Sequence, residues 1–250
     1  MRYFIELSYN GKNYHGWQMQ PNASSVQQTI KDAISKILRS DINIVGAGRT
    51  DAGVHAAQMF AHFDSELELD PYEVANKLNA FLPEDIVIHA IFLAEDEVHA
   101  RFDAISRSYE YRIWLGRNPF LVDTTWQLYQ QRLDIEKMNE AAQVLLDYTN
   151  FKCFSKSKTD VRTYDCKVSN AEWKLKDNSL IFYISADRFL RNMVRAIVGT
   201  LVDIGLGKKS KQDLVKIIKS KDRTKAGLSV PAQGLFLTNV TYKKEVFKNK

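Results

Sequence analysis

The fold is decided near the start of the chain, where residues 2–9 read RYFIELSY and residues 25–38 read SVQQTIKDAISKIL. Apolar and polar side chains largely alternate in the first segment, which is typical of a β-strand. In the second, Ser25 is placed to cap a helix, and apolar residues then recur at the three- and four-residue spacing of a helix face. The pattern therefore predicts a strand followed by an amphipathic helix.

The same alternation of patterns continues along the chain. In the first half it predicts short strands at 42–45 and 57–63, a helix that begins at Asp70-Pro71, and an apolar strand at 86–93. In the second half it predicts a strand at 107–113, a helix from Asp134, a hairpin of strands 168–175 and 180–186, a long helix at 189–205, a helix capped by Ser210, and a strand at 235–242. The order is β-α-β-β-α-β twice, with one extra helix.

This order is that of two ferredoxin-like repeats. We expect an α+β fold in which the repeats form one mixed, mostly antiparallel sheet, with helices on one face and a ligand cleft on the other. The predicted domains are residues 1–105 and residues 106–250, with the junction between Ala94 and Ser106.

Composition narrows the class of protein. Of 250 residues, 45% are hydrophobic and 26% are charged, as expected for a soluble globular protein. No apolar run approaches the roughly 20 residues of a membrane-spanning helix, and Glu6 interrupts what would be the core of a signal peptide. Cys153 and Cys166 do not have the spacing of a zinc site, so a reducing cytoplasm is the expected location.

Charge is concentrated in one segment. The net charge is +5, and residues 208–225 contain eight Lys and Arg residues against Asp213 and Asp222. A basic surface of this kind suits a polyanionic partner. A solvated lysine-rich helix and loop is the plainer interpretation of the same pattern.

The usual catalytic motifs do not occur. The five histidines form no HExxH pattern, there is no GxSxG or phosphate-binding loop, and the glycines at 46–48 lack the third glycine of a dinucleotide fold. What remains is GAGRTDAGVH at 46–55, between two predicted strands. It is either a hairpin loop with a solvated Arg49–Asp51 pair or a carboxylate presented at the end of a sheet beside a cation.

Several motifs together resemble one family. They are YNG at 9–11, YHGWQ at 14–18, GRTDAGVHA at 48–56, LNAFLP at 78–83, HARFDA at 99–104, RSYEYR at 107–112, FLRNMVR at 189–195 and GL at 234–235. This set is similar to the TruA family of tRNA pseudouridine synthases and covers nearly the whole chain. Two stretches depart from the family's usual pattern, AAQM at 56–59 and FKCFSK at 151–156, and we expect them to affect substrate details.

The resemblance implies an isomerase that converts uridine to pseudouridine in the anticodon stem-loop of tRNA, at positions 38, 39 and 40 of that RNA. It implies no metal and no cofactor, an RNA-binding cleft, tRNA as the partner and a homodimer in the cytoplasm. Asp51 would be the nucleophile, by attack on the uracil ring, attack on the sugar or a glycal-type elimination.

The resemblance also assigns further residues. Arg195 would pair with the Asp51 carboxylate, Tyr109 would stack on the base and remove its proton, and Leu235 would line the pocket. Arg49 would fill the gap left by the flipped base. The expected phosphate contacts are Lys152, Lys156, Lys158, Arg162 and the cations of residues 208–225.

Two other classes of function remain open from the residues alone. A non-catalytic RNA-binding module would share the basic surface, but its aromatic RNP motif does not occur in the sequence. A metal-dependent hydrolase could use Asp51 and His55, although no further ligands follow at a suitable spacing.

Overall fold

The computed structural model describes residues 1–156 and 161–248. The chain forms two compact units, Met1–Ser106 with Leu237–Lys250, and Arg107–Phe236. Lys158, a predicted phosphate contact, lies outside the described residues.

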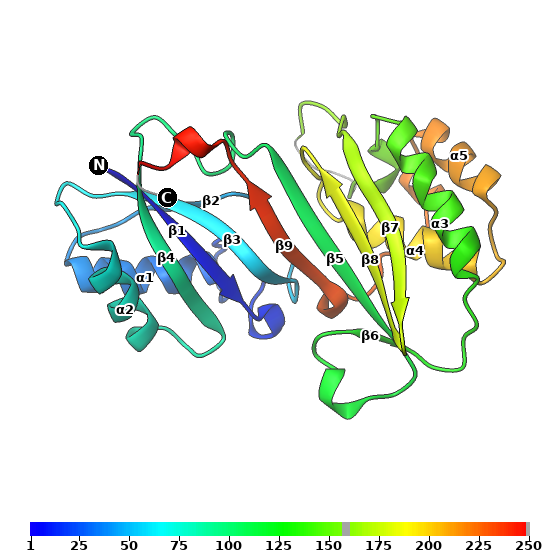
Figure 1. Cartoon of the computed structure of the whole chain (residues 1–250), viewed down its shortest axis with the longest axis horizontal. Helices are drawn as coiled ribbons and strands as arrows, with labels where there is room; N and C mark the ends of the chain where they lie inside the picture. The colour runs from blue at the N-terminus through cyan, green and yellow to red at the C-terminus, as the bar shows by residue number, and fades with distance from the viewer. Residues whose placement is uncertain (157–160, 249–250) are drawn as a thin grey trace. The chain divides into compact units, whose positions relative to one another are not determined.

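The first unit contains the first β-α-β-β-α-β repeat, as predicted (Figure 1). Its helices α1 and α2 lie together on one side of the strands. The strand order is β4-β1-β3-β9, with β2 also paired to β3. The elements are β1 (Arg2–Tyr9), α1 (Val26–Leu38), β2 (Ile44–Gly46), β3 (His55–Asp64), α2 (Pro71–Phe81), β4 (Ile86–Ala94) and most of β9 (Leu235–Thr241).

The second unit contains β-α-β-β-α of the second repeat and the predicted extra helix, whereas the strand that closes this repeat, β9, lies mostly in the first unit. Its strand order is β5-β8-β7, with a short β6 beside β5 that the sequence does not predict. Helix α3 packs against both α4 and α5. The elements are β5 (Ser106–Leu115), β6 (Trp126–Leu128), α3 (Ile135–Gln143), β7 (Val168–Lys176), β8 (Ser179–Ala186), α4 (Met193–Gly205) and α5 (Lys211–Ser220).

Strand pairing agrees with the predicted fold class. β1 pairs antiparallel with β3 and β4, and β8 pairs antiparallel with β5 and β7. β6 runs parallel to β5. The mixed, mostly antiparallel α+β fold is therefore confirmed.

The last segment of the chain lies in the first unit, whereas the predicted second domain runs through to residue 250. The backbone amide of Val240 donates to Oε1 of Gln58 on β3 at 2.9 Å. Tyr242 and Phe247 pack edge to face against the ring of Phe4, with centroids 5.6 and 5.5 Å away. These contacts bury Phe4 completely, although the alternation in β1 places it on the polar face.

Helix ends follow local polar chemistry. The side chains of Ser25, Asp70 and Ser210 cap α1, α2 and α5, as predicted, and Ser210 forms a complete capping box with Asp213. The predicted helix at 189–205 begins later, at Met193, because Asn192 has a left-handed backbone (φ 66°) that cannot continue a helix.

Neither cysteine forms a disulfide. Cys153 and Cys166 are both buried, and burial raises the pKa of each thiol to about 12. In the part of the chain that the structure describes, no helix has both the length and the apolar character needed to cross a bilayer.

Candidate active site

The loop between β2 and β3, which carries Asp51, is held by the segment that follows β1. The amide of Gly53 donates to the carbonyl of Tyr14 at 3.2 Å, and the amide of Trp17 donates to the carbonyl of Thr50 at 3.3 Å. In the interior, the hydroxyls of Tyr9 and Thr50 share a hydrogen bond of 2.8 Å. Residues 9–17 therefore hold the backbone of this loop in place, and we call this segment the cradle.

Two glycines allow the cradle and the loop to approach closely. A Cβ on Gly11 would collide with the carbonyl oxygen of Val54, and a Cβ on Gly16 with that of Thr50. Gly16 also has φ +93°, which side chains of L-residues rarely adopt. A Cβ on Gly48, in the loop itself, would meet nothing within 4 Å, so a glycine at this position is not required for the contact.

Asp51 is a partly exposed residue of this loop. It lies between Thr50, which is buried, and a turn in which the amide of Val54 donates to the Asp51 carbonyl at 3.1 Å. A fixed backbone with an accessible carboxylate is what a nucleophile requires.

His55 has a structural role in this part of the fold. Its ring is buried, and its Nδ1 accepts a hydrogen bond of 3.0 Å from the amide of Gly11. The hydrolase interpretation would have to use the remaining ring nitrogen. Within the described residues, no three His, Cys, Asp or Glu side chains gather in a way that could hold a metal ion.

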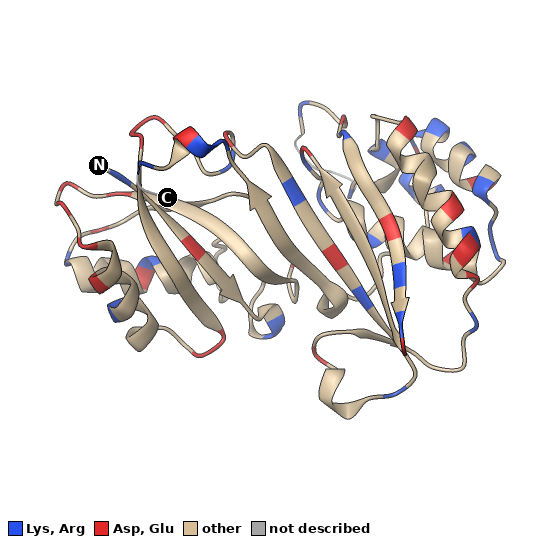
Figure 2. Ribbon diagram, in the orientation of Figure 1, with Lys and Arg blue, Asp and Glu red and all other residues tan. Residues whose placement is uncertain are grey.

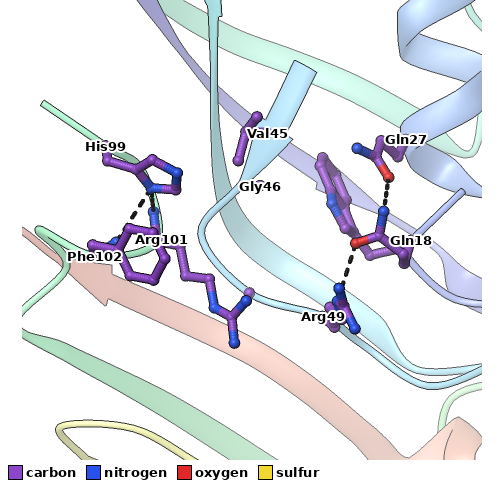
Figure 3. Close-up of a pocket in the computed structure, with 10 residues that line it drawn as sticks. Gln18, Gln27, Val45, Gly46, Arg49, His99, Arg101 and Phe102 are labelled. Carbon is purple, nitrogen blue, oxygen red and sulfur yellow. Dashed lines mark hydrogen bonds between the residues drawn. The ribbon is translucent and has the colours of Figure 1, made fainter. Parts of the chain in front are cut away.

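Arg49 is exposed and is oriented by side-chain amides. Its Nε donates to Oε1 of Gln18 at 3.1 Å. Gln18 donates to Oε1 of Gln27 at 2.8 Å, and Gln27 donates to the carbonyl of Ile44 at 2.7 Å. Figure 3 shows the bonds from Arg49 to Gln18 and from Gln18 to Gln27, with Arg101 and Phe102 on the other side of the cavity. The volume of this cavity is about 220 Å³.

Tyr109 lies on β5 of the second unit. It is half-buried, and its ring packs edge to face on Phe189 with centroids 5.1 Å apart. Its backbone faces Ile184 of β8 in the sheet register. These contacts hold an aromatic ring that is still partly accessible.

Arg195 is a half-buried residue of α4. Its Nε donates to the carbonyl of Val230 at 2.7 Å, and its own carbonyl accepts from the Val230 amide at 3.3 Å. The neighbouring Tyr111 donates to the carbonyl of Pro231 at 2.8 Å, and burial raises the pKa of its hydroxyl while the charge of Arg195 opposes that rise. The guanidinium of Arg195 is thus fixed by backbone.

The remaining predicted contacts differ in surroundings. Leu235 is buried at the start of β9. The Lys152 ammonium lies 5.5 Å from the ring centroid of Tyr164, the Lys156 amide donates to the Arg191 carbonyl, and Arg162 is exposed.

The basic segment is centred on α5, and Figure 2 shows its charges along that helix and the loop after it. Two of its cations serve the fold. Lys209 pairs with Asp203 at 2.6 Å, and Arg223 donates to the carbonyl of Gly227 and the hydroxyl of Ser229. The exposed cations are Lys208, Lys211, Lys216, Lys219, Lys221 and Lys225.

The structure brings Arg49 and Asp51 together on one loop of the first unit. Tyr109, Arg195 and Leu235 belong to the second unit, on β5, α4 and the start of β9. Sequence patterns predict no role for four further residues that line the cavity, although three of them stand in the motifs quoted above. The four are Gln18, Gln27, Arg101 and Phe102, of which Gln27 lies outside those motifs.

A family model described as tRNA pseudouridine synthase matches residues 7–103 and 141–243. A protein of Bacteroides thetaiotaomicron named tRNA pseudouridine synthase A is 50% identical, over 100% of this chain and 93% of its own length. Proteins of the same name from Parabacteroides distasonis and Thermoanaerobacter sp. are 51% and 41% identical, over 98% and 95% of this chain and 98% of each relative. The chain belongs to the tRNA pseudouridine synthase family.

This membership confirms the resemblance seen in the sequence. Pseudouridine synthases isomerise uridine to pseudouridine, and the chain is an isomerase of that family. Arg49, Asp51, Arg195 and Leu235 lie in the segments that the family model matches, whereas Tyr109 lies between those segments.

Proposed function

We propose that the chain isomerises uridine in the anticodon stem-loop of tRNA and that Asp51 is the nucleophile. The relatives' shared name supports tRNA as the substrate. The observation that carries the assignment of Asp51 is its position: a partly exposed carboxylate on a loop whose backbone is clamped by Tyr14 and Trp17.

The reaction balances without a further reactant. The bond from N1 of uracil to C1′ of ribose breaks and a bond from C5 to C1′ forms, while C5 loses a proton and N1 gains one. Substrate and product contain the same atoms and electrons, so no cofactor is needed. An ionised carboxylate suits such a sequence because it attacks readily and can leave again.

Two residues of the second unit assist in this proposal. Arg195, with its Nε fixed on the Val230 carbonyl, pairs with the carboxylate of Asp51 and orients it. Tyr109 stacks on the target base and removes the C5 proton, and Leu235 lines the pocket for that base.

The target uridine has to leave the base stack of the RNA before it can react. Arg49 occupies the place of the flipped base, since a guanidinium plane stacks well on neighbouring bases. Lys152, Lys156, Arg162 and the exposed lysines of residues 208–225 contact phosphates. The enzyme acts as a homodimer in the cytoplasm, with one tRNA touching both subunits.

The test is nucleoside chromatography of a tRNA transcript digested after incubation with the purified chain. We expect pseudouridine to form, and none to form in a transcript whose anticodon stem-loop uridines 38 to 40 are replaced by cytidine. Pseudouridine in the replaced transcript would contradict the proposed position, and its absence from both would contradict the proposed function.

A further inference from the structure

The cavity beside the Asp51 loop is built within the first unit. Residues from four segments line it: Trp17 and Gln18, Gln27, four residues between Val45 and Arg49, and three between His99 and Phe102. Its volume of about 220 Å³ lies below the roughly 300–1,000 Å³ of pockets for drug-sized ligands. It therefore suits a single nucleobase or phosphate better than a dinucleotide.

The charged side chains that line the cavity are cationic. Arg49 and Arg101 approach it from different segments, and the described lining residues include no Asp or Glu (Figure 3). The ring of Phe102 stands beside them, 75% exposed and 5.7 Å from the guanidinium carbon of Arg101. An exposed aromatic ring and two guanidinium groups around one cavity have the chemistry that binds single-stranded nucleotides, because bases stack on the ring and phosphates pair with arginine.

The turn that presents Arg101 and Phe102 is fixed in place. The amides of both residues donate to Nδ1 of His99, at 3.1 and 3.4 Å, and the His99 amide donates to Asp103 at 2.7 Å. Beneath the turn, the amide of Ala100 donates to Nδ1 of the buried His62 at 3.0 Å. The exposure of Phe102 thus comes from a preorganised turn.

The facing side of the cavity is equally constrained. Arg49 is held by Gln18, which is tied through Gln27 to the carbonyl of Ile44. Asp51 follows Arg49 by two residues on the same clamped loop. A nucleotide in the cavity therefore lies next to the loop that carries the proposed nucleophile.

We propose that this cavity binds a nucleotide adjacent to the target uridine in the substrate RNA. Phe102 stacks on the base of that nucleotide, and Arg101 receives a flanking phosphate, while Arg49 keeps its proposed place in the base stack. The proposal rests on the proposed function, since it takes the RNA at this loop to be the substrate.

The experiment uses the full chain with Asp51→Ala, so that bound RNA is not converted. Two anticodon stem-loop RNAs carry 2-aminopurine, one directly 5′ and one directly 3′ of the target uridine. We expect the fluorescence of one of them to be quenched on binding. Phe102→Leu should abolish that quenching, and Phe102→Tyr should retain it because the ring is kept.

Affinity gives a second readout. Loss of one base-aromatic stack should raise the Kd of the unlabelled RNA about 5- to 100-fold in Phe102→Leu. Arg101→Gln should lower the slope of log Kd against log salt by about one. The matched control is Tyr72→Leu, since Tyr72 is 78% exposed on α2, outside the cavity lining, and should change neither readout.

Unchanged quenching of both RNAs in Phe102→Leu would overturn the proposal. A second pair of results would also overturn it: uridine monophosphate binds the wild type but not Phe102→Leu, and the RNA binds Phe102→Leu with unchanged affinity. The cavity would then bind a free nucleotide and not the substrate RNA. Failure of the proposed function has a different signature, namely that the wild-type chain forms no pseudouridine in tRNA.

Discussion

Nδ1 of His55 accepts a buried hydrogen bond of 3.0 Å from the backbone amide of Gly11. Because Nδ1 is the acceptor, the neutral ring carries its proton on Nε2. This bond joins the segment after β1 to the first residue of β3, directly after the loop of Asp51. The histidine of the GRTDAGVHA motif thus has a positioning role, and the position of Asp51 depends on residues about forty places earlier in the chain.

The cradle predicts a strong effect of one methyl group. Gly11→Ala would drive a Cβ into the carbonyl oxygen of Val54. We expect overpacking of this kind to cost about 1–3 kcal/mol of the free energy of unfolding, measured by urea titration, and to lower kcat by displacing Asp51. Gly48→Ala is the control because its Cβ would meet open space, and equal effects of the two substitutions would argue against the cradle.

The buried His62 predicts a pH-dependent stability. Burial, together with the charges of Arg2 and His99, lowers the pKa of His62 to about 4 in the folded chain, and the charge of Asp64 only partly opposes this. The folded state therefore binds fewer protons than the unfolded state between pH 6.5 and 4. The contribution of the neutral His62 ring to the free energy of unfolding is fully present above about pH 6.5. It falls by about 2–3 kcal/mol as the pH drops to 4.

Denaturant titrations across this pH range check that expectation. His62→Asn keeps an acceptor for the Ala100 amide and removes the titrating ring, so its decline should be shallower. His89→Asn, at an exposed histidine on β4, should decline as the wild type does. If His62→Asn loses stability with falling pH as steeply as the wild type, the loss arises from other groups. Asp64 is one such group, since its bond to Arg2 lowers its pKa.

Arg223 is expected to act on stability. It donates to the Gly227 carbonyl at 3.1 Å and to the Ser229 hydroxyl at 2.9 Å. Arg223→Gln leaves those acceptors without a charged donor and should cost about 1–3 kcal/mol, seen as a lower Tm. Lys225→Gln, in the same exposed segment, should leave Tm unchanged, and the opposite ranking would contradict the structural role of Arg223.

The exposed lysines of α5 are expected to act on RNA affinity. Lys211→Glu with Lys219→Glu removes two proposed phosphate contacts from exposed positions. Filter binding across a salt series should show weaker tRNA binding and a shallower salt dependence, each lost contact lowering the slope by about one. Lys244→Glu makes the same kind of charge reversal in the other unit. Equal affinity of the double variant and the wild type at low salt would remove α5 from the interface.

Much of the fold follows from local pattern. Alternation in β1 and capping by Ser25, Asp70 and Ser210 act within a few residues, so the sequence predicts those elements. The late start of α4 depends on the left-handed backbone of Asn192. The burial of Phe4 depends on Phe247, more than two hundred residues away in the chain. No periodicity records such contacts.

The site divides in the same way. Asp51 and Arg49 stand in one short motif that the sequence makes conspicuous. Arg101 and Phe102 lie about fifty residues beyond, and the folded turn held by His62 brings them to the cavity that Arg49 also lines. Their place beside Arg49 could not be inferred from sequence spacing, because it depends on the tertiary fold of the chain.

The proposed function depends above all on the action of the Asp51 carboxylate on the target uridine. The most direct measurement is tritium release from C5-labelled uridine in tRNA, for the wild type and Asp51→Ala, with tRNA binding measured on the same samples. We predict that Asp51→Ala lowers the release by roughly 10⁴-fold or more and still binds tRNA. Release at the wild-type rate from Asp51→Ala would contradict the account.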